Sequence, residues 1–209
     1  MTTVFSHIKA RALALFLACC ICFTALQPSE SFAEPAWPQD VLIEAEGGIL
    51  VDADSGTVLY GKNIHQRYYP ASITKILTAL IVIERCKLDD TITFSYDAVH
   101  NVESGSTSAG YGVGDKITVR EALYALLLRS ANEVANALAE HCAGSREAFA
   151  RLMNEKAASL GCKESHFTNP SGLNDENHYT TAYDYSLIAM AAFKNPTFVE
   201  FDSTTYYEL

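Results

Sequence analysis

Residues 69–84 read YPASITKILTALIVIE. Beyond its first residues this segment is almost wholly apolar, which is typical of a helix buried in a protein core. The pattern predicts a helix over residues 70–86, with Pro70 in its first turn. Ser72 and Lys75 lie three residues apart, so on a helix they share one face and their side chains are close enough to exchange a proton.

This serine and lysine have the chemistry of a nucleophile and its base. A serine hydroxyl is inert at neutral pH without a base, and the nearest candidate base for Ser72 is Lys75 rather than a histidine. Burial disfavours the charged ammonium, so we expect a lowered pKa that lets Lys75 take the Ser72 proton. We also expect Ser72 to be buried. The pair alone is a weak signal, because a serine and a lysine at this spacing occur by chance on many helices.

The first 33 residues have the features of a secretory signal peptide. Lys9 and Arg11 precede an apolar run over residues 12–26, and residues 31–33 offer small side chains at the two positions that a signal peptidase reads. The run is short for a membrane span, which needs about 20 residues. We therefore expect export with cleavage after residue 33, leaving one domain over residues 34–209; a membrane anchor is the alternative.

The composition is that of an acidic globular protein, since 49% of its 209 residues are apolar. Cleavage after residue 33 would remove Lys9, Arg11 and Glu30, leaving 13 basic and 24 acidic residues and a net charge of −11. Such a charge argues against nucleic-acid binding.

Three cysteines, Cys86, Cys142 and Cys162, would remain after cleavage. An odd number leaves at least one thiol unpaired or paired between chains, and an internal bridge could join any two of them. Their spacing matches no metal site, and no cofactor motif accompanies them.

The remaining sequence predicts a hairpin and several helices. Two β-rich runs, 48–52 and 57–60, flank an Asp/Ser/Gly turn. Residues 104–114 are rich in glycine and serine. The simplest interpretation is a surface loop, and the more specific one is a loop at the rim of a cleft. The other expected features are a capping box at Thr118 and Glu121, helices over 122–128, 133–142, 145–160 and 181–193, and a turn-rich connection over 167–173. We expect the helix over 181–193 to be the last, ended by Asn195-Pro196.

Ser130-x-Asn132 lies between two of these helices and adds a second motif. The Ser130 hydroxyl can relay a proton to a leaving amine and the Asn132 amide can hold a substrate carbonyl; helix capping is the alternative role. With Ser72-x-x-Lys75, this pair matches the first two of three motifs of penicillin-binding proteins and serine β-lactamases. The chain most resembles the low-molecular-mass D-alanyl-D-alanine carboxypeptidases, the S11 serine peptidases. The segments that carry this resemblance are 50–60, 70–75, 126–133, 167–173 and 178–184.

The resemblance implies an α+β fold of the β-lactamase/transpeptidase type, a helical cluster packed on an antiparallel sheet. It implies a serine-type carboxypeptidase that removes the terminal D-Ala from peptidoglycan stem pentapeptides through an acyl-enzyme on Ser72. Lys75 would be the base, Ser130 and Asn132 would assist, and the Ser72 N–H would form half of an oxyanion hole. No cofactor or metal is expected, β-lactams would be inhibitors, and the protein would act at the outer face of the cytoplasmic membrane or in the periplasm.

The sequence departs from the family pattern in one respect. No Lys-Thr-Gly motif, the third of the family, follows Asn132, and the strands and C-terminal β-domain that accompany it are also missing. We therefore expect an N-terminal fragment or a truncated gene product with an incomplete catalytic domain and a sheet reduced to the first hairpin. Any peripheral membrane contact would belong to the missing part.

Three alternatives remain open. A class A-like serine β-lactamase shares the first two motifs but needs a Glu-x-x-Leu-Asn loop, where this chain has Phe-Thr-Asn-Pro at residues 167–170. A Ser-His-Asp hydrolase would place its serine in Gly-x-Ser-x-Gly, unlike Ser72. The third alternative is a catalytically inactive, truncated module that binds peptidoglycan.

Overall fold

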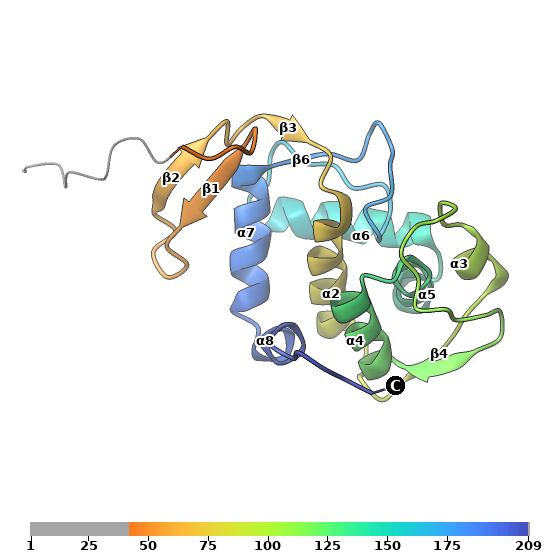
Figure 1. The fold of residues 1–209 in the computed structure, drawn as a ribbon. Coiled ribbons are helices and arrows are strands. Elements are labelled where there is room, and N and C mark those ends of the chain that lie inside the picture. Colours follow the sequence, from red (N-terminus) through yellow and green to blue (C-terminus); the bar gives the residue numbers. More distant parts are fainter. Residues whose placement is uncertain (1–41, 209) are drawn as a thin grey trace, which may run out of the picture. The chain divides into compact units, whose positions relative to one another are not determined.

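The computed structural model describes residues 42–208 (Figure 1). The predicted signal peptide lies outside these residues. Residues 43–208 belong to one compact unit. Its helices are α2 (Thr74–Arg85), α3 (Tyr96–His100), α4 (Val119–Arg129), α5 (Asn132–Ala143), α6 (Arg146–Ser159), α7 (Ala182–Phe193) and α8 (Pro196–Asp202), and a 3-10 turn, η1 (Ala71–Ile73), precedes α2. Its strands are β1 (Gly48–Val51), β2 (Val58–Lys62), β3 (Arg67–Tyr68), β4 (Thr91–Thr93), β5 (Lys116–Thr118) and β6 (Thr180–Thr181).

The strands form three antiparallel pairs, β1–β2, β3–β6 and β4–β5. The predicted hairpin is confirmed: Leu50 lies opposite Tyr60, and the Asp52 carboxylate accepts from the Ser55 N–H at 2.8 Å within the turn. The expectation of a single hairpin was wrong, because two further pairs join segments that are distant in the sequence. Pairs of two or three residues carry too short an alternation to be recognised before the chain is folded.

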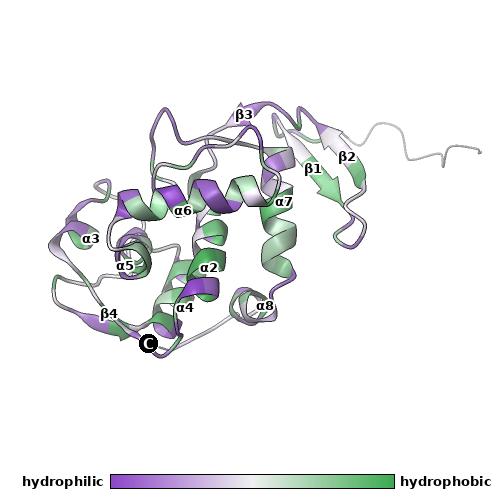
Figure 2. Cartoon of the chain, turned by 180° about the vertical axis from the view of Figure 1, so that it is seen from behind, coloured by the Kyte–Doolittle hydropathy of each residue, from purple (hydrophilic) through white to green (hydrophobic). Residues whose placement is uncertain are grey.

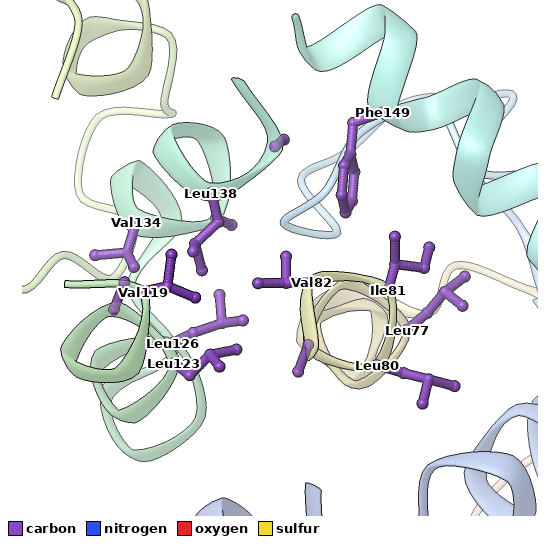
Figure 3. Packing of buried hydrophobic residues seen from close by; sticks show 14 of the residues in the cluster. Leu77, Leu80, Ile81, Val82, Val119, Leu123, Leu126, Val134, Leu138 and Phe149 are labelled. Atoms are coloured by element: carbon purple, nitrogen blue, oxygen red, sulfur yellow. The ribbon is translucent and has the colours of Figure 1, made fainter. Parts of the chain in front are cut away.

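Helix α2 lies at the centre of the helical cluster, with α7 on one side and α4 and α5 on the other (Figure 1). Most of its apolar side chains are completely or almost completely buried; Val82 points toward α4 and α5, and Ile81 points toward Phe149 of α6 (Figure 3). The labelled residues of this core are Leu77, Leu80, Ile81, Val82, Val119, Leu123, Leu126, Val134, Leu138 and Phe149. Burying a large aliphatic or aromatic side chain contributes about 1.5–3 kcal/mol, so this packing fixes the position of α2.

The hydropathy of the helices follows this arrangement (Figure 2). Most of α2 is hydrophobic, whereas α6 mixes hydrophilic and hydrophobic residues along its length. Between residues 42 and 208, no helix combines the length and the apolarity needed to cross a bilayer.

Several predicted helix ends are confirmed. The capping box is present, with Thr118 and Glu121 each accepting from the other's backbone N–H. Helix α5 ends at Gly144, whose φ of +83° is the left-handed conformation that favours glycine. Helix α6 begins after Ser145, whose hydroxyl accepts from the Ala148 N–H.

Two predicted boundaries were wrong. The α-helical geometry of α2 begins at Thr74 rather than at residue 70, because Ala71 has a φ of +51° and lies in the 3-10 turn. Helix α7 is not the last, because Pro196 begins α8 instead of ending the helical region. Proline is well suited to a first helical position, where its missing N–H needs no partner, and Asn195 caps this helix by accepting from two backbone N–H groups.

Candidate active site

Ser72 and Lys75 lie together at the start of α2. The Lys75 Nζ is 3.2 Å from the Ser72 Oγ. Lys75 is buried, with 2% of its surface exposed, but Ser72 is exposed, so the expectation of a buried serine was wrong. The reason is the η1 turn, which carries Ser72 beyond the N-terminal end of the buried helix. The resulting pair combines an accessible hydroxyl with a buried amine.

The surroundings of Lys75 lower its pKa. Two effects act on this pKa. Burial disfavours the ammonium and lowers the pKa, whereas the negative charge of Glu133 raises it by a smaller amount. The result is a pKa of about 8 for Lys75. The amine also donates to the Ser171 carbonyl oxygen at 2.7 Å. Near neutral pH a fraction of the Lys75 side chains is therefore neutral and able to accept a proton from Ser72.

Ser130 faces the same cavity as this pair. The cavity has a volume of about 270 Å³, and its lining comprises Ser72, Ile73, Lys75, Ile76, Leu126, Leu127, Ser130 and Asp202. The structure therefore brings three of the four predicted site residues to one cavity. The fourth, Asn132, lies in the first turn of α5 with 4% of its surface exposed and does not line this cavity.

The turn that carries the second motif is held in an unusual conformation. Ser130 has a φ of +58°, in the left-handed region that costs a residue with a side chain about 1–2 kcal/mol. Within residues 42–208, the Ser130 Oγ and the Asn132 Oδ1 are buried and have no hydrogen-bond partner. Buried polar atoms without a partner are rare, and both of these groups keep an unused capacity for hydrogen bonding.

The alternative role of this motif, helix capping, is performed in part by the backbone: Ser130 ends α4 as its left-handed C-cap and donates its N–H to the Ala125 carbonyl oxygen. Capping by the side chains of the motif is not seen among the described residues. The residue at the start of α5 is Ala131, which makes no side-chain cap, and the Ser130 hydroxyl makes no hydrogen bond to the described part of the chain.

The connection over residues 167–173 packs along the polar side of α2. Besides the bond from Lys75, the Thr78 hydroxyl donates to the Pro170 carbonyl oxygen at 2.7 Å. The Asn169 side-chain oxygen accepts from the backbone N–H groups of Gly172 and Leu173 at 2.7 and 3.1 Å, which holds the connection in a tight turn. These bonds fix the backbone against which the Lys75 amine rests.

At Gly172 this connection comes very close to the η1 turn that carries Ser72. Its φ is +83°, and a Cβ at this position would lie 1.9 Å from the Ala71 carbonyl oxygen. Only glycine allows this approach to the residue that precedes Ser72.

His178 is hydrogen-bonded to Thr74, the first residue of α2. Its Nδ1 accepts from the Thr168 N–H at 3.1 Å, so the proton of the neutral ring is on Nε2, which lies 2.9 Å from the Thr74 Oγ1 and donates to it. Burial lowers the pKa of His178 to about 4. The ring is therefore neutral near pH 7 and acts as a fixed hydrogen-bond link between Thr74 and residues 167–173.

Residues 42–208 contain no cluster of three His, Cys, Asp or Glu side chains that could hold a metal ion. Cys86, Cys142 and Cys162 are half-buried free thiols.

A family model described as D-alanyl-D-alanine carboxypeptidase, peptidase family S11, matches residues 33–209. The chain belongs to this family. The D-alanyl-D-alanine carboxypeptidase DacF of Bacillus subtilis is 37% identical over 166 residues, which are 77% of this chain and 42% of that protein. DacA of Escherichia coli is 32% identical over 207 residues, 93% of this chain and 51% of that protein. The chain thus spans about half the length of the curated relatives it matches.

The fold of the S11 chain is also found in solved structures. Penicillin-binding protein 6B from Escherichia coli aligns with a TM-score of 0.75 at 31% identity, over 80% of this chain and 56% of that one. The DD-transpeptidase of Streptomyces K15 aligns with a TM-score of 0.73 at 33% identity, over 78% of this chain and 66% of that one. The predicted α+β fold of the β-lactamase/transpeptidase type is therefore confirmed.

Four residues near the site were not predicted from the sequence to belong to it: Glu133, Gly172, His178 and Asp202. Three of them lie in segments that carried the resemblance, 126–133, 167–173 and 178–184, but nothing in a single sequence says what these segments contact in the fold. Asp202 comes from α8, a helix that the sequence analysis did not predict.

Proposed function

We propose that the protein is a serine-type D-Ala-D-Ala carboxypeptidase that removes the terminal D-Ala from peptidoglycan stem pentapeptides. The observation that carries this proposal is the 3.2 Å approach of the buried Lys75 amine to the exposed Ser72 hydroxyl, at a cavity that Ser130 also lines. The names of the S11 relatives, which are D-alanyl-D-alanine carboxypeptidases, support the choice of substrate.

The proposed reaction is a two-step acyl transfer. The neutral Lys75 amine takes the Ser72 proton while the Ser72 Oγ attacks the carbonyl carbon of the penultimate D-Ala. The C–N bond to the terminal D-Ala breaks, and the leaving amine receives a proton relayed through the Ser130 hydroxyl. Water then hydrolyses the ester on Ser72 and regenerates the enzyme.

Two further groups assist in this proposal. The Asn132 side-chain amide holds a carbonyl of the stem peptide, and the backbone N–H of Ser72 donates to the oxyanion that forms during attack. β-Lactams resemble D-Ala-D-Ala and acylate the same hydroxyl, in keeping with the name of the penicillin-binding protein that shares this fold.

The proposed location is the cell envelope, at the outer face of the cytoplasmic membrane or in the periplasm. Support comes from the sequence alone, in which a basic start, an apolar run and a small-residue cleavage site precede the S11 domain.

Release of D-Ala from a synthetic peptide that ends in D-Ala-D-Ala tests the proposed activity. The protein encoded by the gene should release D-Ala, and Ser72→Ala should not. Ser159→Ala, which alters an exposed serine at the end of α6, should release D-Ala at the unchanged rate and is the matched control. Release that survives in Ser72→Ala would show that another group is the nucleophile.

The same preparation tests the β-lactamase alternative. A carboxypeptidase should turn over a chromogenic cephalosporin slowly, because its acyl-enzyme hydrolyses slowly. Rapid, repeated turnover without release of D-Ala would show a β-lactamase. Binding of peptidoglycan with neither activity would show an inactive module.

A further inference from the structure

Glu133 is a buried acid that the proposed mechanism does not use. It lies in the first turn of α5, directly after Asn132, and only 2% of its surface is exposed. One carboxylate oxygen, Oε1, accepts from the Ser108 hydroxyl at 2.8 Å, the Ala109 N–H at 2.6 Å and the Gly110 N–H at 3.1 Å. The other oxygen, Oε2, is buried without a partner in the described part of the chain.

The segment that Glu133 holds is docked on the turn of the second motif. The Asn132 N–H donates to the Thr107 carbonyl oxygen at 3.0 Å, and the Arg129 Nε donates to the Ser108 carbonyl oxygen at 3.4 Å. Residues 107–110 belong to the glycine- and serine-rich segment, so this segment is fixed beside Ser130 and Asn132 by bonds from both sides of their turn.

We propose that Glu133 is a positioning residue of the acylation site, which holds residues 107–110 against the Ser130–Asn132 turn and sets the charge around Lys75. This inference rests on the proposed acyl transfer at Ser72 and adds a residue to it.

The strained conformation of Ser130 supports the positioning role. A left-handed residue with a side chain persists only where the surrounding structure holds it in place. Hydrogen bonds to a charged carboxylate are stronger than those between neutral groups, and the negative charge of Glu133 is also favoured at the N-terminus of α5. The clamp formed by Glu133 and residues 107–110 therefore supplies the constraint that the Ser130 turn requires.

The charge of Glu133 acts on Lys75 as well. It raises the pKa of Lys75 and opposes the effect of burial. The other titratable groups on elements near Lys75 are His178, Tyr185 and Asp202. His178 and Tyr185 are neutral near pH 7, because burial lowers the pKa of the first to about 4 and raises that of the second. Asp202 lines the cavity but is exposed to solvent, which screens its charge.

The test measures acylation by a fluorescent penicillin as a function of pH, in the protein as its gene encodes it. Glu133→Gln keeps the shape of the side chain and an oxygen acceptor but removes the charge. The loss of a negative charge lowers the pKa of Lys75, so the rise of the acylation rate with pH should move to lower pH. A purely structural role for Glu133 would leave the position of this rise unchanged.

Ser108→Ala separates the clamp from the charge. It removes one hydrogen bond to Glu133 and leaves the carboxylate charged, so we expect the acylation rate to fall about 3- to 10-fold at every pH, without a shift along the pH axis. Glu155→Gln, which neutralises an exposed carboxylate on α6, should change neither quantity and is the matched control.

The outcomes are distinct. An unshifted pH profile in Glu133→Gln, or an unchanged acylation rate in Ser108→Ala, overturns the inference about Glu133. The proposed function stands in that case, provided that the unaltered protein is labelled at Ser72. If Glu133→Gln does not fold, Ser108→Ala decides. If the unaltered protein is not labelled at Ser72, the proposed function is wrong and this inference falls with it.

Discussion

At the scale of single residues, the chemistry of the site depends on the balance of effects on Lys75. Burial lowers its pKa to about 8, although the Glu133 charge opposes the change. A base must be neutral to take a proton, so the rate of acylation by penicillin should rise with pH through about 8 and then level. A stopped-flow measurement of fluorescent-penicillin binding gives this profile, and a rate that does not depend on pH between 6 and 9 would contradict the role of Lys75 as base.

Lys75→Arg provides the complementary test. Arginine keeps the positive charge but cannot be deprotonated at any accessible pH, so acylation should be lost at every pH. Circular dichroism of the variant checks that the fold is retained. Acylation at the unchanged rate would show that Ser72 has another base.

Gly172 shows how strictly the backbone is specified beside Ser72. A methyl group at this position would meet the Ala71 carbonyl oxygen at 1.9 Å, and the φ of +83° adds strain. Gly172→Ala should lower the free energy of unfolding by about 2–4 kcal/mol, from left-handed strain and overpacking together. Urea denaturation measures this quantity, and the same variant should be acylated more slowly because the Ser72 turn is displaced.

Gly56→Ala is the matched control for this prediction. Gly56 has a similar φ of +73°, but a Cβ there would meet no atom within 4 Å. Its cost should be about 1 kcal/mol, with acylation unchanged. Equal losses in the two variants would show that the close approach at Gly172 does not matter.

At the scale of elements, the site depends on how α2 is joined to residues 167–173. Thr78→Val preserves the side-chain shape but leaves the buried Pro170 carbonyl oxygen without its donor. The expected loss of unfolding free energy is about 1–3 kcal/mol, with slower acylation because the neighbouring Ser171 carbonyl oxygen is the acceptor for Lys75. Thr91→Val, on the exposed side of β4, should lose less than about 0.5 kcal/mol. Equal stability of the two variants would show that the Thr78 hydrogen bond to Pro170 does not stabilise the fold.

The sequence predicted the elements whose ends carry local signals. The Thr118 capping box, the Ser145 cap and Gly144 each act within a few residues, so they could be recognised without the fold. The strand pairs β3–β6 and β4–β5 join segments with no such local signal, and α8 was missed because Pro196 both ends one helix and begins another.

For the candidate site, the sequence predicted some of the residues but not their surroundings. Spacing alone placed Ser72 beside Lys75, and motif matching added Ser130 and Asn132. The exposure of Ser72 could not be foreseen, since it depends on the 3-10 turn and on the left-handed Ala71. The role of Glu133 could not be foreseen either, because its partners lie 23 to 25 residues away in a segment without periodicity.

At the scale of the whole molecule, the neutral His178 links stability to pH. Its pKa is about 4 in the folded protein and near 6.5 when exposed, so the unfolded chain binds the extra proton first as the pH falls. The contribution of His178 is complete above about pH 6.5 and is lost as the pH falls to about 4, with a cost of about 3 kcal/mol. Urea denaturation at several pH values should show this slope.

His178→Gln should remove much of that slope, whereas His100→Gln, at an exposed histidine, should leave it unchanged. A slope between pH 4 and 6.5 that is identical in the unaltered protein and in His178→Gln would contradict the assignment of a buried neutral ring.

The proposed function requires Ser72 to be the nucleophile. Its most direct test is mass spectrometry of the protein after brief treatment with benzylpenicillin, followed by peptide mapping. We expect a single adduct with the full mass of the penicillin on the peptide that contains Ser72, and none in Ser72→Ala. An adduct on any other residue, or an adduct that persists in Ser72→Ala, would contradict it.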